Sequence, residues 1–191
     1  MRRRPVHSSA RDGVSLRQGH LSVIIGSRSV VGARSAELWC SGAISLWLAS
    51  LPTGSTVMSG GAPGIDEMGV WAARISGIPT VEYKLDGRRW LNGVPAVGEK
   101  AWWSTDKPPS ANTDRQAWRA WCLRRDDAVV AAVKAAVTAG WTYSVFGIVA
   151  PWPSSPKGRM TAGTDYTLQR FREADLKVVR LEVPADLNPH P

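Results

Sequence analysis

The chain has 191 residues, of which 43% are hydrophobic and 21% are charged, and its formal net charge is +8. This composition fits one compact domain with a sizeable core and excludes general disorder. No apolar run approaches the roughly 20 residues of a membrane span, and no apolar segment follows the basic start as in a secretory signal, so we expect a cytoplasmic protein without a membrane partner.

The first 20 residues form a basic segment, with five arginines against one aspartate, and carry about half of the net charge. Because they show no apolar periodicity, we expect a flexible arm at 1–20. Such an arm either contacts a polyanion such as nucleic acid or is simply a solvated tail, and the sequence leaves both readings open.

From residue 21 onward, short apolar runs alternate with segments of helical periodicity. The pattern predicts five strands, at 21–26, 56–59, 80–85, 142–150 and 177–181. It predicts four helices, at 30–51, 65–75, 114–139 and 164–174. Five tryptophans of these helices are expected in the core: Trp39, Trp47, Trp71, Trp118 and Trp121.

Strands that alternate with helices predict an α/β fold, here a Rossmann-like, open and mainly parallel sheet of five strands with helices on both faces. We expect one domain at 21–181 and a loose tail at 182–191. A segment rich in Gly, Pro and Trp at 86–113 shows no clear period and is expected to be a long binding loop or lid.

Unusual residues follow three of the predicted strands, where an open parallel sheet binds its ligands. Glycines there let backbone N–H groups approach an anion, and a following helix N-terminus favours negative charge. We therefore expect a phosphate-binding cradle. Its candidates are Gly26, Ser27 and Arg28 after the first strand; Ser59, Gly60, Gly61, Gly64 and Asp66 after the second; and Ser155, Arg159, Gly163 and Thr164 after the fourth.

The sequence gives little support for a metal site or for catalysis by histidine. The two cysteines, Cys40 and Cys122, form no Cys-x-x-Cys pair, and the three histidines lie near the chain ends. There is no Gly-x-Gly-x-x-Gly after the first strand and no Walker A lysine, which speaks against the usual dinucleotide enzymes and NTPases. We expect no metal and no cofactor.

The order of these motifs resembles the SLOG superfamily. The motifs are 26–28, the Ser-Gly-Gly-Ala-Pro-Gly-Ile-Asp run at 59–66, Arg125-Asp126 and Gly163-Thr164. That superfamily includes the LOG phosphoribohydrolases, the YspA-like proteins and the DNA-processing protein DprA. The resemblance implies a Rossmann-like nucleotide-binding fold and a homodimer, with Arg125 as a further ligand-binding residue.

The chain looks most like the YspA-like subgroup but departs from each pattern. The YspA-like Arg-Asn pair is Arg125-Asp126 here, and an ionised aspartate cannot donate a hydrogen bond. The glutamate of the LOG pattern is Thr167, so a hydrolase of this type would depend on Asp66 or Asp165. Asp66 caps the helix that follows it, which is the stronger interpretation for this residue alone, or contacts a ribose hydroxyl, which fits the family pattern. Arg125 either forms a surface ion pair or binds the ligand.

Three functions remain in view. The first is a protein that binds a nucleotide or a nucleotide-derived phosphorylated ligand as a sensor, carrier or sequestering protein. The second is an N-glycosidic hydrolase of nucleoside monophosphates. The third is a DprA-like protein that binds single-stranded DNA through the basic arm and the tryptophans of the loop at 86–113.

Overall fold

The computed structural model describes residues 19–96, 110, 112–150 and 162–187. Seven strands belong to this part of the chain: β1 (His20–Gly26), β2 (Ser55–Ser59), β3 (Thr80–Tyr83), β4 (Arg89–Leu91), β5 (Val94–Pro95), β6 (Thr142–Val149) and β7 (Val179–Glu182). The helices are α1 (Arg34–Ala49), α2 (Ile65–Ile75), α3 (Arg115–Thr138) and α4 (Ala162–Glu173), with 3₁₀ turns η1 (Arg28–Val30) and η2 (Ala185–Leu187).

The described strands form one sheet in the order β5-β4-β3-β2-β1-β6-β7. Five consecutive strands of this sheet, β3-β2-β1-β6-β7, pair in parallel. The chain moves outward from β1 to β3, then crosses back to β6 and continues to β7. The strand order therefore reverses between β1 and β6, which is the switch point where α/β sheets of this kind bind ligands.

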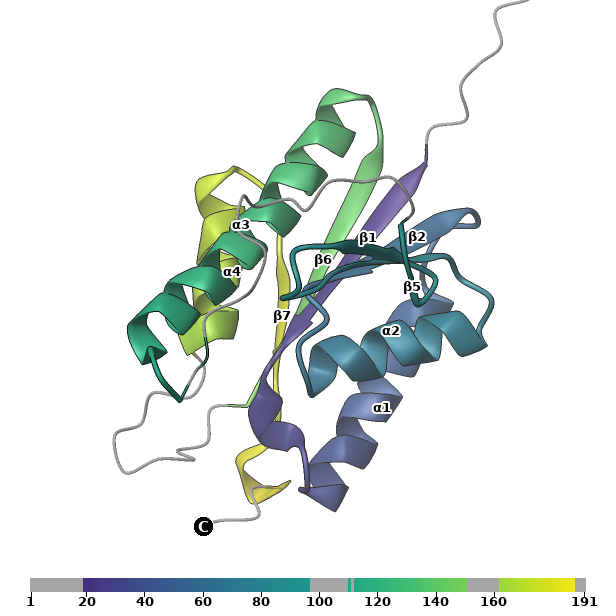
Figure 1. Ribbon diagram of the computed structural model, residues 1–191. Helices are drawn as coiled ribbons and strands as arrows, with labels where there is room; N and C mark the ends of the chain where they lie inside the picture. Colours follow the sequence, from purple (N-terminus) through teal and green to yellow (C-terminus); the bar gives the residue numbers. More distant parts are fainter. Residues whose placement is uncertain (1–18, 97–109, 111, 151–161, 188–191) are drawn as a thin grey trace, which may run out of the picture.

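Helices cover the two faces of the sheet in pairs (Figure 1). On one face α1 and α2 pack on β1 and β2, with Ile24, Ile44 and Ile65 fully or almost fully buried between them. On the other face α3 and α4 bury the alternate residues of β1, including Val23, against Val133 and Phe171. The apolar stripes of the helices thus pack on both faces of the parallel sheet, as the sequence predicts.

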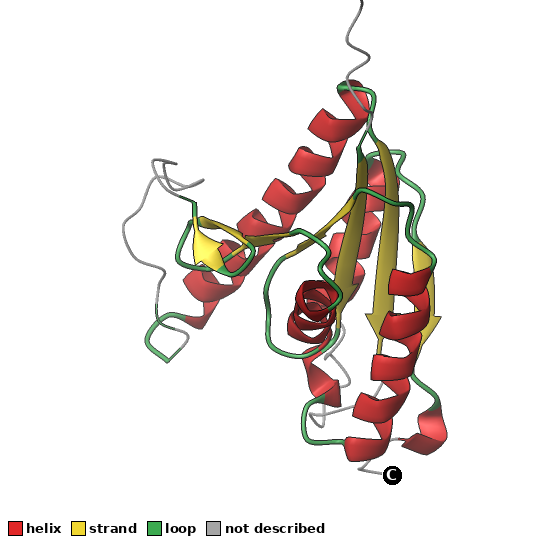
Figure 2. Cartoon of the chain, turned by 90° about the vertical axis from the view of Figure 1, so that its right-hand side faces the viewer, coloured by secondary structure: helices red, strands yellow, loops and turns green. Residues whose placement is uncertain are grey.

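The sheet is larger than the predicted five strands, because part of the expected loop at 86–113 folds as a hairpin. β4 and β5 pair antiparallel with each other, and β4 pairs antiparallel with β3. Asn92 and Gly93 connect them with φ angles of 50° and 86°, as a tight hairpin turn requires. The hairpin lies at the edge of the sheet opposite to β7 (Figure 2).

The ends of the domain also differ from the expectation. His20, placed in the arm, begins β1 and pairs with Ser55 and Thr142. Glu182, placed in the tail, ends β7, and Val183 is buried after it. Residues 1–18 and 188–191 lie outside the described residues.

Only part of the tryptophan prediction holds. Trp47 and Trp121 are buried, and Trp47 stacks on Phe146 with 5.2 Å between ring centroids. Trp39 and Trp118 are partly buried, whereas Trp71 is 64% exposed, so its assignment to the core was wrong. A helical wheel cannot tell a core side chain from one that lies at the border of the apolar stripe.

None of the described helices is long and apolar enough to cross a membrane.

Candidate functional site

The candidate site lies at the carboxyl ends of β1 and β2, beside the switch point. There η1 follows β1, at the lower centre of Figure 1, and the glycine loop, residues 60–64, connects β2 to α2. The loop approaches β1 closely. A Cβ on Gly64 would lie 2.7 Å from the carbonyl oxygen of Ser27, and Gly64 has a φ of 97°. Only glycine fits both this contact and this conformation.

Asp66, in the first turn of α2, fastens the two chain segments together. Its Oδ1 accepts a hydrogen bond from the amide of Gly26 over 2.8 Å, and its Oδ2 accepts one from the amide of Ala62 over 3.3 Å. The side chain is 4% exposed. The expectation that Asp66 caps α2 was wrong, because Gly64 is the N-cap and Asp66 turns back to the middle of the glycine loop and to the end of β1.

Arg125, in the middle of α3, lies directly against this arrangement. A Cβ on Gly60 would lie 3.1 Å from the guanidinium carbon of Arg125 and 3.2 Å from Oδ2 of Asp66. Gly60 therefore leaves room for both side chains. The Nε and Nη2 of Arg125 donate to Oδ1 of Asp126 over 2.9 and 2.6 Å. Both residues of this pair are buried, at 5% and 6% exposure, which excludes the reading of Arg125 as a surface ion pair.

The third nitrogen of this guanidinium is the unusual feature. Arg125 Nη1 is buried and has no hydrogen-bond partner among the described residues. Buried donors of a charged group are nearly always paired, because leaving one unpaired costs about 1–3 kcal/mol or more. Nη1 is therefore the nitrogen of this guanidinium that no described residue satisfies.

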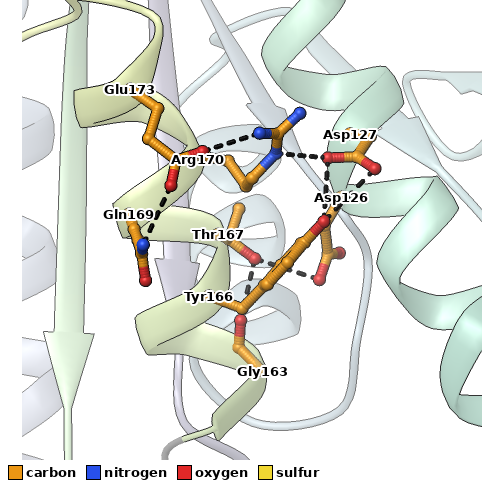
Figure 3. A network of polar contacts seen from close by, with 8 residues as sticks. All are labelled: Asp126, Asp127, Gly163, Tyr166, Thr167, Gln169, Arg170 and Glu173. Carbon is orange, nitrogen blue, oxygen red and sulfur yellow. Dashed lines mark hydrogen bonds and ion pairs between the residues drawn. The ribbon is translucent and has the colours of Figure 1, made fainter.

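Asp126 joins this cluster to α4 (Figure 3). Its Oδ2 accepts from the hydroxyl of Thr167 over 3.0 Å, and the same hydroxyl lies 2.9 Å from the carbonyl oxygen of Gly163. The next residue of α3, Asp127, accepts from Tyr166 and Arg170. Two layers of polar contacts therefore fix α3 against α4, and the inner layer holds the carboxylate that orients Arg125.

Burial dominates the electrostatics of the cluster. It raises the pKa of Asp66 from 3.8 to about 6, although Arg125 and the amide of Gly26 favour the ionised form. It also raises the pKa of Asp126, against the opposing effects of Arg125 and Thr167. The pKa of Arg125 is raised, because the two carboxylates outweigh its burial. Arg125 thus stays charged while Asp66 titrates near neutral pH.

A second charged group lies on the other side of the glycine loop. Glu82 in β3 is 2% exposed and pairs with Arg74 and, over 2.5 Å, with Nζ of Lys84. A Cβ on Gly61 would lie 3.1 Å from both Glu82 Oε2 and Lys84 Nζ. Burial lowers the pKa of Lys84, and the charge of Arg74 lowers it further. Lys84 therefore holds a partly buried ammonium group against the loop.

Three of the predicted site residues have structural contacts that explain them. Ser27 is buried, and its Oγ accepts from the amide of Ala150 over 3.0 Å, which extends the pairing of β1 with β6. Ser59 is also buried, and its Oγ accepts from the amide of Gly61 and so shapes the loop. Gly26 lets α2 approach, because a Cβ there would lie 2.1 Å from Cβ of Ile65.

Arg28 is exposed and lies beside α3. Burial raises the pKa of both Cys122 and Asp126, while the charges of Arg125 and Arg28 counteract the rise. The exposed guanidinium of Arg28 thus lies near the buried guanidinium of Arg125.

The residues predicted after the fourth strand divide into three groups. Gly163 and Thr164 lie in the first turn of α4, near Asp126 through Thr167. Asp165 is half-exposed and lies 3.8 Å from Nη2 of Arg180 in β7. Because residues two apart point to nearly opposite sides of a helix, Asp165 does not join the cluster that Thr167 contacts. Ser155 and Arg159 lie outside the described residues.

Sequence reasoning missed Glu82, Lys84 and Thr167, and left the contact of Asp126 in doubt. Glu82 alternates with apolar residues in β3 at a position that faces the interior, and a carboxylate at such a position signals a buried ion pair. No comparable signal exists for Thr167, since only the crossing of α3 and α4 brings it to Asp126.

A comparison with protein-family models finds no match, and a comparison with curated proteins finds none either. Among solved structures, the chain is similar to DNA processing protein A (DprA) from Streptococcus pneumoniae, with 17% sequence identity and a TM-score of 0.35. The similarity covers 84% of this chain and 58% of that one, so the chain spans little more than half of that protein's length. The Rossmann-like assignment rests on the strand order of the sheet itself.

Among the described residues, no group of three or more His, Cys, Asp or Glu side chains is arranged to hold a metal ion.

Proposed function

We propose that the chain binds a phosphorylated small molecule, a nucleotide or a nucleotide-derived ligand, at the carboxyl ends of β1 and β2. The observation that carries this proposal is the buried Arg125, whose Nη1 has no partner among the described residues. A phosphate oxygen is the acceptor that suits this donor best, because guanidinium and phosphate pair through charge-assisted hydrogen bonds.

The surroundings of Arg125 support an anion. The glycine loop presents its backbone at the N-terminus of α2, and Gly60 is in contact with the guanidinium. Lys84 adds a second cation at Gly61, and Arg28 an exposed one beside Cys122. Within the proposal, Arg125 binds the phosphate, Lys84 shifts from Glu82 toward it, and Arg28 attracts the ligand from solvent.

We propose binding without turnover, as in a sensor, a carrier or a sequestering protein. A hydrolase would need a carboxylate free to activate water or to stabilise positive charge on the sugar. Both oxygens of Asp66 already accept backbone amides, and Asp165 lies beside Arg180. Asp66 and Asp165, the two carboxylates considered for catalysis, therefore do not lie together in one site. Within this proposal, the chain is a YspA-like member of the SLOG superfamily.

A second candidate ligand is single-stranded nucleic acid, which one observation favours. Arg115 and Arg119 are exposed on α3, one turn apart. Cys122 and Asp126 continue the same helical face at the spacing of one turn each, so an exposed line of cations leads along α3 to the cluster. A polyanion longer than a mononucleotide would follow such a line.

Isothermal titration calorimetry tests the proposal with inorganic phosphate, pyrophosphate, the common nucleoside monophosphates and a single-stranded oligonucleotide as probes. We expect at least one mononucleotide to bind. Arg125→Lys keeps the buried charge but removes the fork of donors, so we expect affinity to fall by a factor of about 10–100, as for the loss of a hydrogen bond to a charged group.

Arg124→Lys is the matched control, since Arg124 is the exposed neighbour of Arg125 on α3 and should bind as the wild type does. Circular dichroism confirms that both variants fold. The proposal fails if no probe binds, or if a folded Arg125→Lys binds with wild-type affinity. Tight binding of the oligonucleotide alone, with a steep dependence on salt, would replace it with the second candidate.

A further inference from the structure

The buried guanidinium of Arg125 already has two carboxylates beside it. Asp126 accepts from its Nε and Nη2, and Oδ2 of Asp66 lies against Gly60 together with the guanidinium. All three charged side chains are buried, so their charges interact strongly. With both carboxylates ionised, this cluster has one negative charge more than it has positive ones.

An anion at Nη1 of Arg125 would enlarge this imbalance. The proposed phosphate adds at least one negative charge beside a guanidinium that two carboxylates already share, and burial makes such an excess costly. The charge of the cluster stays unchanged on binding only if one carboxylate becomes a neutral acid. This inference rests on the proposed function, because it concerns the anion that binds there.

Asp126 is held in its ionised form by charged and polar donors. Its Oδ1 accepts from two nitrogens of Arg125, and its Oδ2 accepts from the hydroxyl of Thr167, as Figure 3 shows. The charge of Arg28 in η1 also favours the ionised form. Hydrogen bonds from a cation are the strongest of these contacts, and a proton on Asp126 would weaken them.

Asp66 accepts from two uncharged groups instead, the amides of Gly26 and Ala62. The bond to Gly26 at Oδ1 is 2.8 Å long, whereas the bond to Ala62 at Oδ2 is 3.3 Å long. Oδ2 therefore loses little when it takes up a proton, and it is also the oxygen that lies against Gly60.

The charged groups around Asp66 come from two further elements. Arg125 of α3 and Lys84, which follows β3, favour its ionised form, whereas Asp126 of α3 favours the neutral one. Burial is the largest influence and raises the pKa of Asp66 to about 6. A bound anion repels the carboxylate and raises this pKa further.

We propose that Asp66 takes up a proton from solvent when the ligand binds, and that the resulting acid donates from Oδ2 to the phosphate beside Arg125. The ligand then meets a neutral donor where the free protein has a carboxylate. Because binding and protonation are linked, the affinity falls as the pH rises. The site thus holds its ligand more tightly in acid.

Isothermal titration calorimetry of the full chain tests this inference, with the nucleoside monophosphates as probes at pH 7 and pH 8. Their phosphates lose the second proton near pH 6 and are mostly dianions at both values. We expect the affinity of the wild type to fall by a factor of about 10 over this interval. Titrations in buffers of different ionisation enthalpy should show about one proton taken up per ligand.

Asp66→Asn has a neutral side chain that can donate at any pH. It should bind with the same affinity at both pH values, without proton uptake, and about tenfold more tightly than the wild type at pH 8. A merely structural role of Asp66 would give weaker binding instead. Asp165→Asn is the matched control, since it changes a half-exposed carboxylate outside the cluster and should keep the pH dependence of the wild type.

The outcomes separate this inference from the proposed function. A wild type that binds none of the probes overturns both. Equal wild-type affinity at the two pH values overturns the inference alone, as does proton uptake that persists in a folded Asp66→Asn. If circular dichroism shows that this variant does not fold, infrared difference spectra of the wild type decide instead. A band of a protonated carboxylic acid that appears at pH 8 on addition of the ligand supports the inference, and its absence overturns it.

Discussion

Asp66 couples the stability of the site to pH. Its pKa is about 6 in the folded protein against an ordinary value of 3.8, because burial disfavours its ionised form. A raised pKa means that the folded state holds its proton more tightly than the unfolded state. Protonation therefore stabilises the fold, and this contribution is lost as pH rises through about 6.

We predict that lowering the pH from about 7.5 to about 5 raises the free energy of unfolding by about 1 kcal/mol through Asp66. Asp66→Asn should show a smaller gain, and what remains reflects the raised pKa of Asp126. Asp165→Asn, which changes a half-exposed carboxylate outside the cluster, should keep the full gain. Urea unfolding at the two pH values measures this, and an equal gain in Asp66→Asn would contradict it.

At the residue scale, the sequence predicted which residues lie at the site better than it predicted what each side chain contacts. Gly60, Asp66 and Arg125 do meet, although Arg125 lies 65 residues after Gly60 and 59 after Asp66 in the chain. Their contacts could not be predicted, because a loop motif does not show which way a carboxylate turns. Asp66 looked like a cap by its place at a helix start, yet burial and two backbone donors draw it back toward β1.

The hairpin of β4 and β5 is the element on which the second charged group depends. Thr80 in β3 donates its amide to Oδ1 of Asn92, and Asn92 donates its amide to the carbonyl of Thr80. Arg74 reaches from α2 to Thr80 and to Glu82. The turn at Asn92 and Gly93 therefore lies against Arg74. Arg74 pairs with Glu82, and Glu82 in turn holds Lys84 beside the glycine loop.

We predict that Gly93→Ala destabilises the protein more than Gly54→Ala does. Both glycines have positive φ, 86° and 82°, so each alanine costs roughly 1 kcal/mol in backbone strain. At Gly93 the added Cβ would also lie 3.2 Å from Cζ of Arg74, whereas nothing lies within 4 Å at Gly54. Denaturant unfolding measures both, and equal losses would show that Arg74 yields without cost.

At the scale of helices and strands, the length of each element decided whether the sequence could predict it. The four helices and five parallel strands are long enough to show their periods. β4 and β5 have three and two residues, too few for an alternating pattern to appear. The Asn-Gly pair at 92–93 was the available signal for a hairpin, but the surrounding Gly, Pro and Trp residues indicated a loop.

For the whole molecule, the alternation of strands and helices predicts the class of fold but not the surfaces that remain. The crossover direction places α1 and α2 on one face and α3 and α4 on the other. The resulting open face over β6 and β7 follows from the chain having no further helix there among the described residues. No local sequence pattern predicts this open face, because it depends on how all the connections between strands are arranged around one sheet.

An apolar groove of about 890 Å³ lies between α1 and the strands β6 and β7, and its lining shares no side chain with the cluster around Arg125. Two places without a shared side chain should respond independently. We expect Leu46→Glu, which changes an exposed residue of this groove, to bind the mononucleotide that the wild type binds with the same affinity and with one ligand per chain. Calorimetry at matched chain concentrations measures both quantities. A change of about tenfold or more in affinity would mean that the groove is coupled to the carboxyl ends of the strands, with a coupling free energy of about 1.4 kcal/mol.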